Sequence, residues 1–235
     1  MTAVSEIYSP GYCDTYAALY IDPWPAKHAT NLAILDFLLD GGPQTRWLDL
    51  ACGQAWHFAH LAGRAQMTGV DASASQLAKA RIAAPHATFV CEDLRTFTPP
   101  PDAFDLITVF WGAYCYLADW PQIAAFLTKA IAALKPDASI YIEVLPIDAI
   151  ETFNSSRLAG KTGFRARRAA QSNHWIYRDS GGVHRTISPP LRYFEALLAG
   201  RFHCVRVHDD GCFMQHLVAY RRADCRGPAP AISFG

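Results

Sequence analysis

The stretch Arg46-Trp-Leu-Asp-Leu-Ala-Cys-Gly-Gln-Ala55 decides the fold of this chain. Its first half is a short apolar run that ends in small residues, which is typical of a buried β-strand followed by a turn. Gly53 lets the backbone of such a turn approach a ligand closely. Residues 54–64 then have the pattern of a short helix. The stretch therefore predicts a strand–turn–helix unit with a ligand at its turn.

Further strands and helices alternate on the C-terminal side of this unit. The sequence predicts strands at 67–71, 88–93, 104–111 and 139–144, a helix that opens with the capping box Ser73–Gln76, and a helix that follows Asp119 and ends before Pro136. Continuous apolar strands alternating with helices predict a doubly wound α/β fold, with a parallel sheet covered on both faces. Ligands of such sheets bind at the carboxyl ends of the strands.

The pattern changes after residue 145. The sequence predicts a hairpin of residues 174–179 and 183–187, a helix near 191–199, and two strands at 202–208 and 213–221 joined by the turn Asp209-Asp-Gly. These last strands form an antiparallel pair, so we expect a mostly parallel, seven-stranded sheet. The domain organisation expected is a single domain over 1–235, a helical cover at 1–43, an inserted hairpin or lid at 146–190, and a loose tail after Ala223.

The amino-acid composition limits the kinds of partner that this protein is expected to bind. Lysine plus arginine and aspartate plus glutamate both number 21, so the formal net charge is zero and a nucleic-acid or membrane partner is not expected. The seven cysteines are scattered without zinc-site spacing, which predicts no metal and a reducing compartment. The first residues lack a basic start and an apolar region, so we expect a cytoplasmic protein. A small-molecule substrate and a monomer or homodimer fit this composition.

Four motifs occur in order along the predicted sheet: Leu48–Ala55, Gly69–Ser73, Glu92–Leu94 and Phe104–Phe110. Together they resemble those of the class I, Rossmann-like S-adenosylmethionine-dependent methyltransferases, specifically those that act on small molecules. The resemblance is strong over residues 44–145, and the final strands share only the family's pattern. It implies S-adenosylmethionine as the cofactor and S-adenosylhomocysteine as the product.

The resemblance also assigns roles to particular side chains. Asp71 would accept hydrogen bonds from the ribose hydroxyls, and Asp93 from the adenine amino group. Asp49 would lie near the methionine end, and Phe110 and Trp111 either pack on the adenine or flank the sulfonium. Tyr16 and Tyr20 either close over the cofactor or pack in the core. The full set of predicted cofactor-binding residues is Tyr16, Tyr20, Asp49, Ala51, Cys52, Gly53, Asp71, Ala72, Asp93, Leu94, Phe110 and Trp111.

The glycine motif departs from the family's pattern at two positions. Ala51 stands where a glycine is usual, and this substitution has little consequence if the backbone φ there is negative. Ala55 replaces a second glycine and is followed by Trp56 and His57, which are bulkier than the pattern prefers and would tighten or alter the pocket.

The expected reaction is methyl transfer to an oxygen or nitrogen of a small, aromatic metabolite. Alignment of the partners supplies much of the acceleration, and a general base is needed only if the acceptor carries its proton. Candidate catalytic residues are His57, Tyr114 and His174, although each also fits a structural position. Three alternatives remain open: a non-methylating enzyme of the same fold and cofactor, such as a cyclase, a nicotinamide-dependent oxidoreductase, and a binding module without activity.

Overall fold

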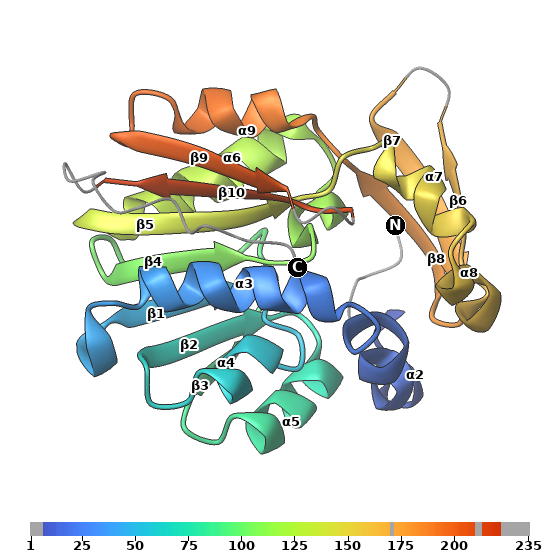
Figure 1. Ribbon diagram of the computed structural model, residues 1–235, viewed down its shortest axis with the longest axis horizontal. Coiled ribbons are helices and arrows are strands. Elements are labelled where there is room, and N and C mark those ends of the chain that lie inside the picture. Colours follow the sequence, from blue (N-terminus) through green and yellow to red (C-terminus); the bar gives the residue numbers. More distant parts are fainter. Residues whose placement is uncertain (1–6, 170–171, 210–212, 222–235) are drawn as a thin grey trace.

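The computed structural model describes residues 7–169, 172–209 and 213–221. Its main sheet has seven strands in the order β3-β2-β1-β4-β5-β10-β9, which Figure 1 shows side by side. Strands β1 to β5 are parallel, and β10 runs antiparallel to β5 and β9. The predicted fold class is confirmed. The strands are β1 Arg46–Leu50, β2 Gln66–Asp71, β3 Thr88–Cys91, β4 Phe104–Val109, β5 Leu134–Val144, β9 Cys204–Asp209 and β10 Gln215–Tyr220.

Alternating side chains of these strands fill a hydrophobic core on each face of the sheet. Trp47 and Leu106 belong to the cluster under α3 Pro25–Leu38, α4 Trp56–His60 and α5 Ala74–Ala83. Leu48 and Ile107, the next residues along, belong to the cluster under α6 Trp120–Ala132 and α9 Leu191–Leu198. Because both faces are covered, the central strands β1 and β4 are largely apolar instead of alternating strictly with polar residues.

The N-terminal residues form helices, as predicted for the cover. Helix α2 Pro10–Tyr16 continues without a break into the π-helical turn η1 Ala17–Ile21, and a 3-10 turn, η2 Gly42–Gln44, follows α3. Tyr8, Tyr12, Tyr16 and Tyr20 recur every four residues, and neighbouring rings pack with centroids 5.3 to 5.6 Å apart. We call these four residues the tyrosine row. Across the described ranges, no helix has the length and apolar character needed to cross a bilayer.

A second sheet lies beyond the carboxyl ends of the main strands, on the right of Figure 1. It is antiparallel, in the order β6-β7-β8, and is preceded by two short helices. The bounds are α7 Ala149–Asn154, α8 Arg157–Thr162, β6 Arg165–Arg168, β7 His174–Asp179 and β8 Gly182–Ile187. Strands β7 and β8 are the predicted hairpin, whereas β6 was not predicted.

Element boundaries shift by a few residues from those predicted. Strand β5 begins at Leu134, five residues before the predicted start, because Phe104 pairs with Leu134 ahead of a bulge in the ladder. Helix α4 is limited to residues 56–60, shorter than predicted. The turn residues 210 and 211 and the tail after Ala223 lie outside the described residues.

Candidate functional site

A cavity lies at the ends of β1, β2 and β4, and residues of the tyrosine row and of the second sheet also line it. Every cofactor-binding residue predicted from the sequence lines it: Tyr16, Tyr20, Asp49, Ala51, Cys52, Gly53, Asp71, Ala72, Asp93, Leu94, Phe110 and Trp111. Their roles toward a cofactor stay predictions. Tyr12, Tyr116, Tyr177 and Asp179 also line this cavity, and the sequence motifs did not predict them; we call the part that they line the second compartment.

The turn after β1 is held in an unusual backbone conformation. Ala51 (φ 65°), Gly53 (φ 53°) and Ala55 (φ 58°) all adopt the left-handed region. The condition under which Ala51 would be harmless, a negative φ, is therefore not met, and each alanine carries about 1–2 kcal/mol of strain. The turn also packs tightly on the neighbouring strand, since a Cβ at Gly69 would lie 2.6 Å from Cys52 Sγ. The close packing of the turn against β2 holds the turn in this strained backbone conformation.

Asp71 connects the end of β2 to this turn. Its Oδ2 accepts from the Gly53 N–H at 2.9 Å, and its Oδ1 accepts from the Ser73 N–H at 2.8 Å. Burial raises the pKa of Asp71, although both N–H donors favour the charged form. The half-buried Asp71 carboxylate keeps further lone pairs on each oxygen, which suits a pair of adjacent hydroxyls.

Asp93 already has a charged partner. Arg95 Nη2 lies 2.5 Å from Asp93 Oδ2, and Arg95 Nε donates to Oδ1 at 2.8 Å. The Arg95 hydrogen bond holds the pKa of Asp93 below its usual value. An adenine amino group at this position would share the carboxylate with Arg95, which sequence reasoning did not anticipate.

Asp49 is buried at the end of β1. Its Oδ1 accepts from Thr108 Oγ1 at 2.7 Å, and Thr108 in turn accepts from Trp47 Nε1 at 2.9 Å. Burial, reinforced by the nearby charges of Glu143 and Asp71, raises the pKa of Asp49 to about 7. This carboxyl group changes charge near neutral pH.

The raised pKa of Asp49 predicts a pH-dependent stability. Above the unfolded pKa of about 4 the unfolded chain loses this proton, whereas the folded protein keeps it up to about pH 7, so the cost of folding grows across that window. Asp49→Asn is expected to raise the free energy of unfolding by roughly 1–3 kcal/mol at about pH 8 and to change it little at about pH 4. Urea unfolding at both pH values measures this, with the exposed Asp137→Asn as control. An equal effect at the two pH values contradicts it.

His57 is the one predicted catalytic residue that reaches the cavity. Its ring stacks on Phe110 with centroids 3.9 Å apart, and its buried Nε2 has no hydrogen-bond partner among the described residues. Burial and the nearby Lys27 and His28 lower the pKa of His57 well below its usual value. His57 is therefore a neutral imidazole beside the cavity, and its Nε2 is buried.

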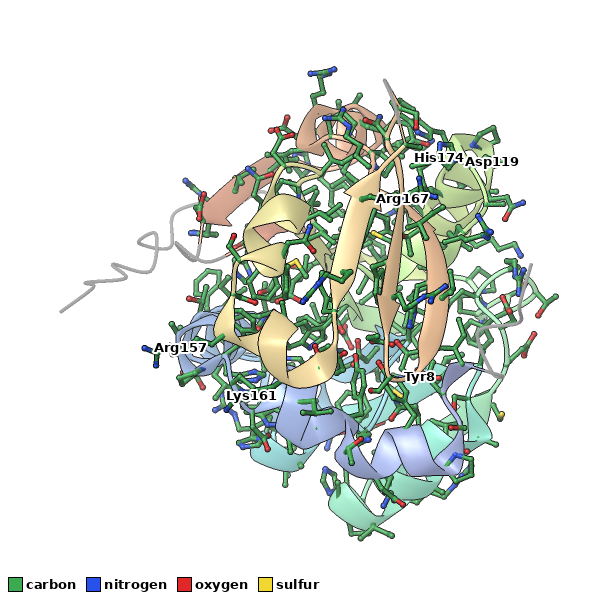
Figure 2. The ribbon with its side chains drawn as sticks, turned by 90° about the vertical axis from the view of Figure 1, so that its right-hand side faces the viewer. Tyr8, Asp119, Arg157, Lys161, Arg167 and His174 are labelled. Carbon is green, nitrogen blue, oxygen red and sulfur yellow. The ribbon has the colours of Figure 1, made fainter. Side chains whose placement is uncertain are left out.

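The other two predicted catalytic residues, Tyr114 and His174, do not line the cavity. Tyr114 is fully buried outside the cavity lining, where its hydroxyl accepts from the Leu145 N–H at 2.9 Å and its ring packs on Phe194. His174 is exposed at the start of β7, labelled near the top of Figure 2, and does not line the cavity. Tyr114 lies in the turn after β4, and its side chain packs in the core against Phe194 of α9.

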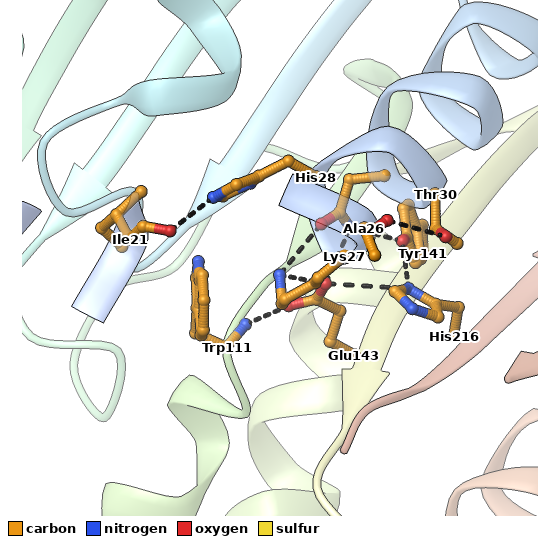
Figure 3. Close-up of polar contacts among 10 residues, drawn as sticks. Ile21, Ala26, Lys27, His28, Thr30, Trp111, Tyr141, Glu143 and His216 are labelled. Carbon is orange, nitrogen blue, oxygen red and sulfur yellow. Dashed lines mark hydrogen bonds and ion pairs between the residues drawn. The ribbon is translucent and has the colours of Figure 1, made fainter. Parts of the chain in front are cut away.

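A buried ion pair behind the cavity was not predicted. Lys27 Nζ lies 2.6 Å from Glu143 Oε1, and neither side chain has exposed surface. Glu143 Oε2 accepts from the Trp111 N–H at 2.5 Å, and Lys27 Nζ stands 3.8 Å over the centre of the Trp111 ring (Figure 3). Burial disfavours the charged carboxylate, but Lys27 and His216 outweigh it and hold the pKa of Glu143 below its usual value. The pair fixes Trp111, whose φ of 57° is strained, on the cavity wall.

The strand order and the position of the cavity define the class of protein, a Rossmann-like class I methyltransferase fold. Residues 48–137 match the methyltransferase domain family. The match covers the four motifs that carried the resemblance, so the predicted recognition is confirmed. The identified domain extends from the end of β1 to the start of β5.

Relatives agree with this assignment. The chain is 32% identical over 97 residues to dTDP-3-amino-3,6-dideoxy-alpha-D-glucopyranose N,N-dimethyltransferase of Streptomyces fradiae, a match that spans 41% of this chain and 38% of that protein. The solved complex of DhpI with SAH superimposes with a TM-score of 0.62 at 18% identity, covering 91% of this chain and 93% of that chain. SAM-bound CalS10, an amino pentose methyltransferase from Micromonospora echinaspora, superimposes with a TM-score of 0.59 at 19% identity. The match covers 83% of this chain and 91% of that chain. At these identities the solved structures share the fold, and the comparisons together support the predicted enzyme class and cofactor.

Proposed function

We propose that this protein transfers the methyl group of S-adenosylmethionine to the amino group of a small metabolite and releases S-adenosylhomocysteine. The observation that carries the proposal is that two sets of side chains line one cavity. One compartment is lined by the turn after β1 and the ends of β2 and β4, and the other by tyrosines and Asp179. Such an arrangement fits a cofactor and an acceptor that meet inside one enclosure.

The first compartment suits S-adenosylmethionine chemically. Asp71 offers carboxylate lone pairs for the two ribose hydroxyls, and the left-handed turn from Ala51 to Ala55 lets the backbone approach the nucleoside. Trp111 presents an aromatic ring to the cavity, a favourable neighbour for a sulfonium.

The second compartment favours an amine over an anionic acceptor. The rings of Tyr12, Tyr20, Tyr116 and Tyr177 attract a cation through their faces, and Asp179 adds a buried carboxylate. Interactions with His184, Tyr12 and Tyr20 outweigh the effect of burial and hold the pKa of Asp179 below its usual value, so this group is charged at neutral pH. The curated relative acts on an amino sugar, which agrees with nitrogen as the methylated atom. Aromatic walls also stack on a flat ring, so an aromatic amine fits the same compartment.

Catalysis then rests on alignment. Methyl transfer is an in-line displacement at the sulfonium methyl, and the sulfonium is already a good leaving group. Holding the nitrogen behind the methyl group can contribute about 7–11 kcal/mol. In this proposal the tyrosine row and the second sheet enclose the acceptor, and the Trp111 ring lies beside the sulfonium of the cofactor.

The experiment is a labelled methyl-transfer assay. The protein is incubated with methyl-labelled S-adenosylmethionine and one of two probes, dTDP-3-amino-3,6-dideoxy-α-D-glucopyranose or benzylamine, and labelled product and S-adenosylhomocysteine are measured. Transfer to either amine is the expected result, and the better probe distinguishes a sugar from an aromatic acceptor. Tight cofactor binding without S-adenosylhomocysteine on any acceptor favours the non-methylating enzyme. Co-purification of a nicotinamide cofactor contradicts the proposal.

A further inference from the structure

Four side chains form a continuous hydrogen-bonded chain from the second sheet to the acceptor compartment. Asp179 Oδ1 lies 3.0 Å from His184 Nε2, and His184 Nδ1 lies 2.7 Å from the Tyr116 hydroxyl. The Tyr116 hydroxyl lies 2.6 Å from the Tyr177 hydroxyl. Both phenols line the cavity, whereas His184 is fully buried behind them. We call these four residues the relay.

The chemistry of the groups fixes the direction of the hydrogen bonds. An ionised Asp179 only accepts, so His184 Nε2 is the nitrogen that donates to it, and a neutral imidazole then presents a lone pair on Nδ1. Tyr116 must therefore donate to His184, and Tyr177 donates to Tyr116. The end of the relay is the Tyr177 oxygen, which keeps its lone pairs.

The surroundings hold the relay rigidly. Asp179 Oδ2 accepts from Tyr12 at 2.7 Å and from Tyr20 at 2.8 Å, and its Oδ1 also accepts from the Gly181 N–H at 2.8 Å. The Tyr177 ring stacks on His184 with centroids 3.9 Å apart. The titratable groups facing His184 are thus Asp179, Tyr116 and Tyr177 in direct contact, with Tyr12 and Tyr20 beyond Asp179 and Tyr8 beside Tyr116. Burial raises the pKa of both Tyr116 and Tyr177, so they remain phenols.

We infer that the relay removes the proton of the acceptor's ammonium group before methyl transfer, an inference that rests on the proposed function. The ammonium N–H bond breaks and an O–H bond forms on Tyr177, while the Tyr177 proton passes to Tyr116 and the Tyr116 proton to His184 Nδ1. The resulting imidazolium is paired with Asp179. The freed nitrogen lone pair forms the N–CH₃ bond as the C–S bond breaks, and the C–S electrons remain on sulfur.

Removing either phenol tests the inference. Tyr116→Phe and Tyr177→Phe keep the rings but interrupt the relay, so kcat is expected to fall about 10²–10³-fold at neutral pH with little change in the KM of the amine probe. In both variants kcat should then rise about tenfold per pH unit toward the pKa of the amine, because solution now supplies the neutral amine. The wild type should lack this steep rise. Tyr193→Phe, whose hydroxyl donates to the Trp120 carbonyl, is the matched control.

The readouts separate the possible failures. Calorimetric binding of S-adenosylmethionine by each variant reports an intact fold and cofactor site. If the wild type methylates neither dTDP-3-amino-3,6-dideoxy-α-D-glucopyranose nor benzylamine, the proposed function fails and the relay fails with it. If the wild type methylates either amine and both variants keep its kcat and pH profile, the relay alone is overturned. ¹⁵N NMR of the neutral His184 gives an independent test, since a proton on Nδ1 instead of Nε2 overturns the relay without any acceptor.

Discussion

Asp71→Ala is expected to weaken S-adenosylmethionine binding about 100-fold or more, the largest expected effect on cofactor affinity. On the proposed role, the carboxylate accepts from two ribose hydroxyls, and a hydrogen bond to a charged group contributes about 1.5–3 kcal/mol. Loss of two such bonds corresponds to at least about two powers of ten in affinity. The variant also removes the acceptor of the Gly53 and Ser73 N–H groups, which loosens the turn after β1.

Calorimetry with S-adenosylmethionine measures the effect. Asp105→Ala is the matched control, because Asp105 also accepts a backbone N–H, that of Arg46, but stands at the opposite end of the same sheet. Asp71→Asn should fall between the wild type and Asp71→Ala, since the amide keeps one carbonyl acceptor. If Asp71→Ala binds the cofactor like the wild type, the cofactor assignment is wrong.

Lys27→Met is expected to lower the free energy of unfolding by about 3–5 kcal/mol, the largest stability effect. Lys27 Nζ is the closest cation to Glu143, and it also donates to Asn31 Oδ1 at 2.9 Å. Removing one partner of a buried ion pair leaves the other charge uncompensated, and this penalty exceeds the modest net contribution of the intact pair. Urea unfolding at about pH 8 measures the loss.

The stability lost in Lys27→Met should depend on pH and on the charge of Glu143. In the wild type the depressed pKa of Glu143 contributes stability that is present above the unfolded value and lost as pH falls through the folded value. Without Lys27 the Glu143 pKa must rise, so acidification to about pH 5 should reduce the deficit of the variant. Adding Glu143→Gln should restore part of the stability, because the amide still accepts from the Trp111 N–H. Arg64→Met, which removes an exposed ion pair with Asp36, should cost less than about 1 kcal/mol; a loss equal to that of Lys27→Met contradicts the argument.

The cofactor compartment could be predicted because its parts are adjacent in sequence to the strands that place them. Asp49, Gly53 and Asp71 each follow or end a predicted strand, and parallel strands bring their carboxyl ends to one edge of the sheet. The backbone of the turn could not be predicted from residue type. Ala51 adopts a left-handed φ that its side chain disfavours, because the packing of Cys52 against Gly69 imposes it.

The acceptor compartment could be predicted only in part. The four-residue spacing of the tyrosine row is visible in the sequence and was the available signal, since such spacing puts side chains on one helix face. Strand β6 was missed because Arg165-Ala-Arg-Arg168 lacks an apolar alternation. The register of β7 and β8 places Tyr177 opposite His184, but their contact with Tyr116 requires the second sheet to pack against the end of β4.

The sequence by itself determined the succession of most strands and helices along the chain, the class of the fold and the residues that line the cavity at one edge of the sheet. Each of these follows from short-range patterns, namely apolar runs, turn residues and helix caps, which act between neighbours in the chain. The tertiary structure decided which charges are paired and which phenols meet an imidazole. Lys27 and Glu143, and likewise Tyr116 and His184, are distant in sequence and become partners only when burial removes water and leaves each group dependent on the other.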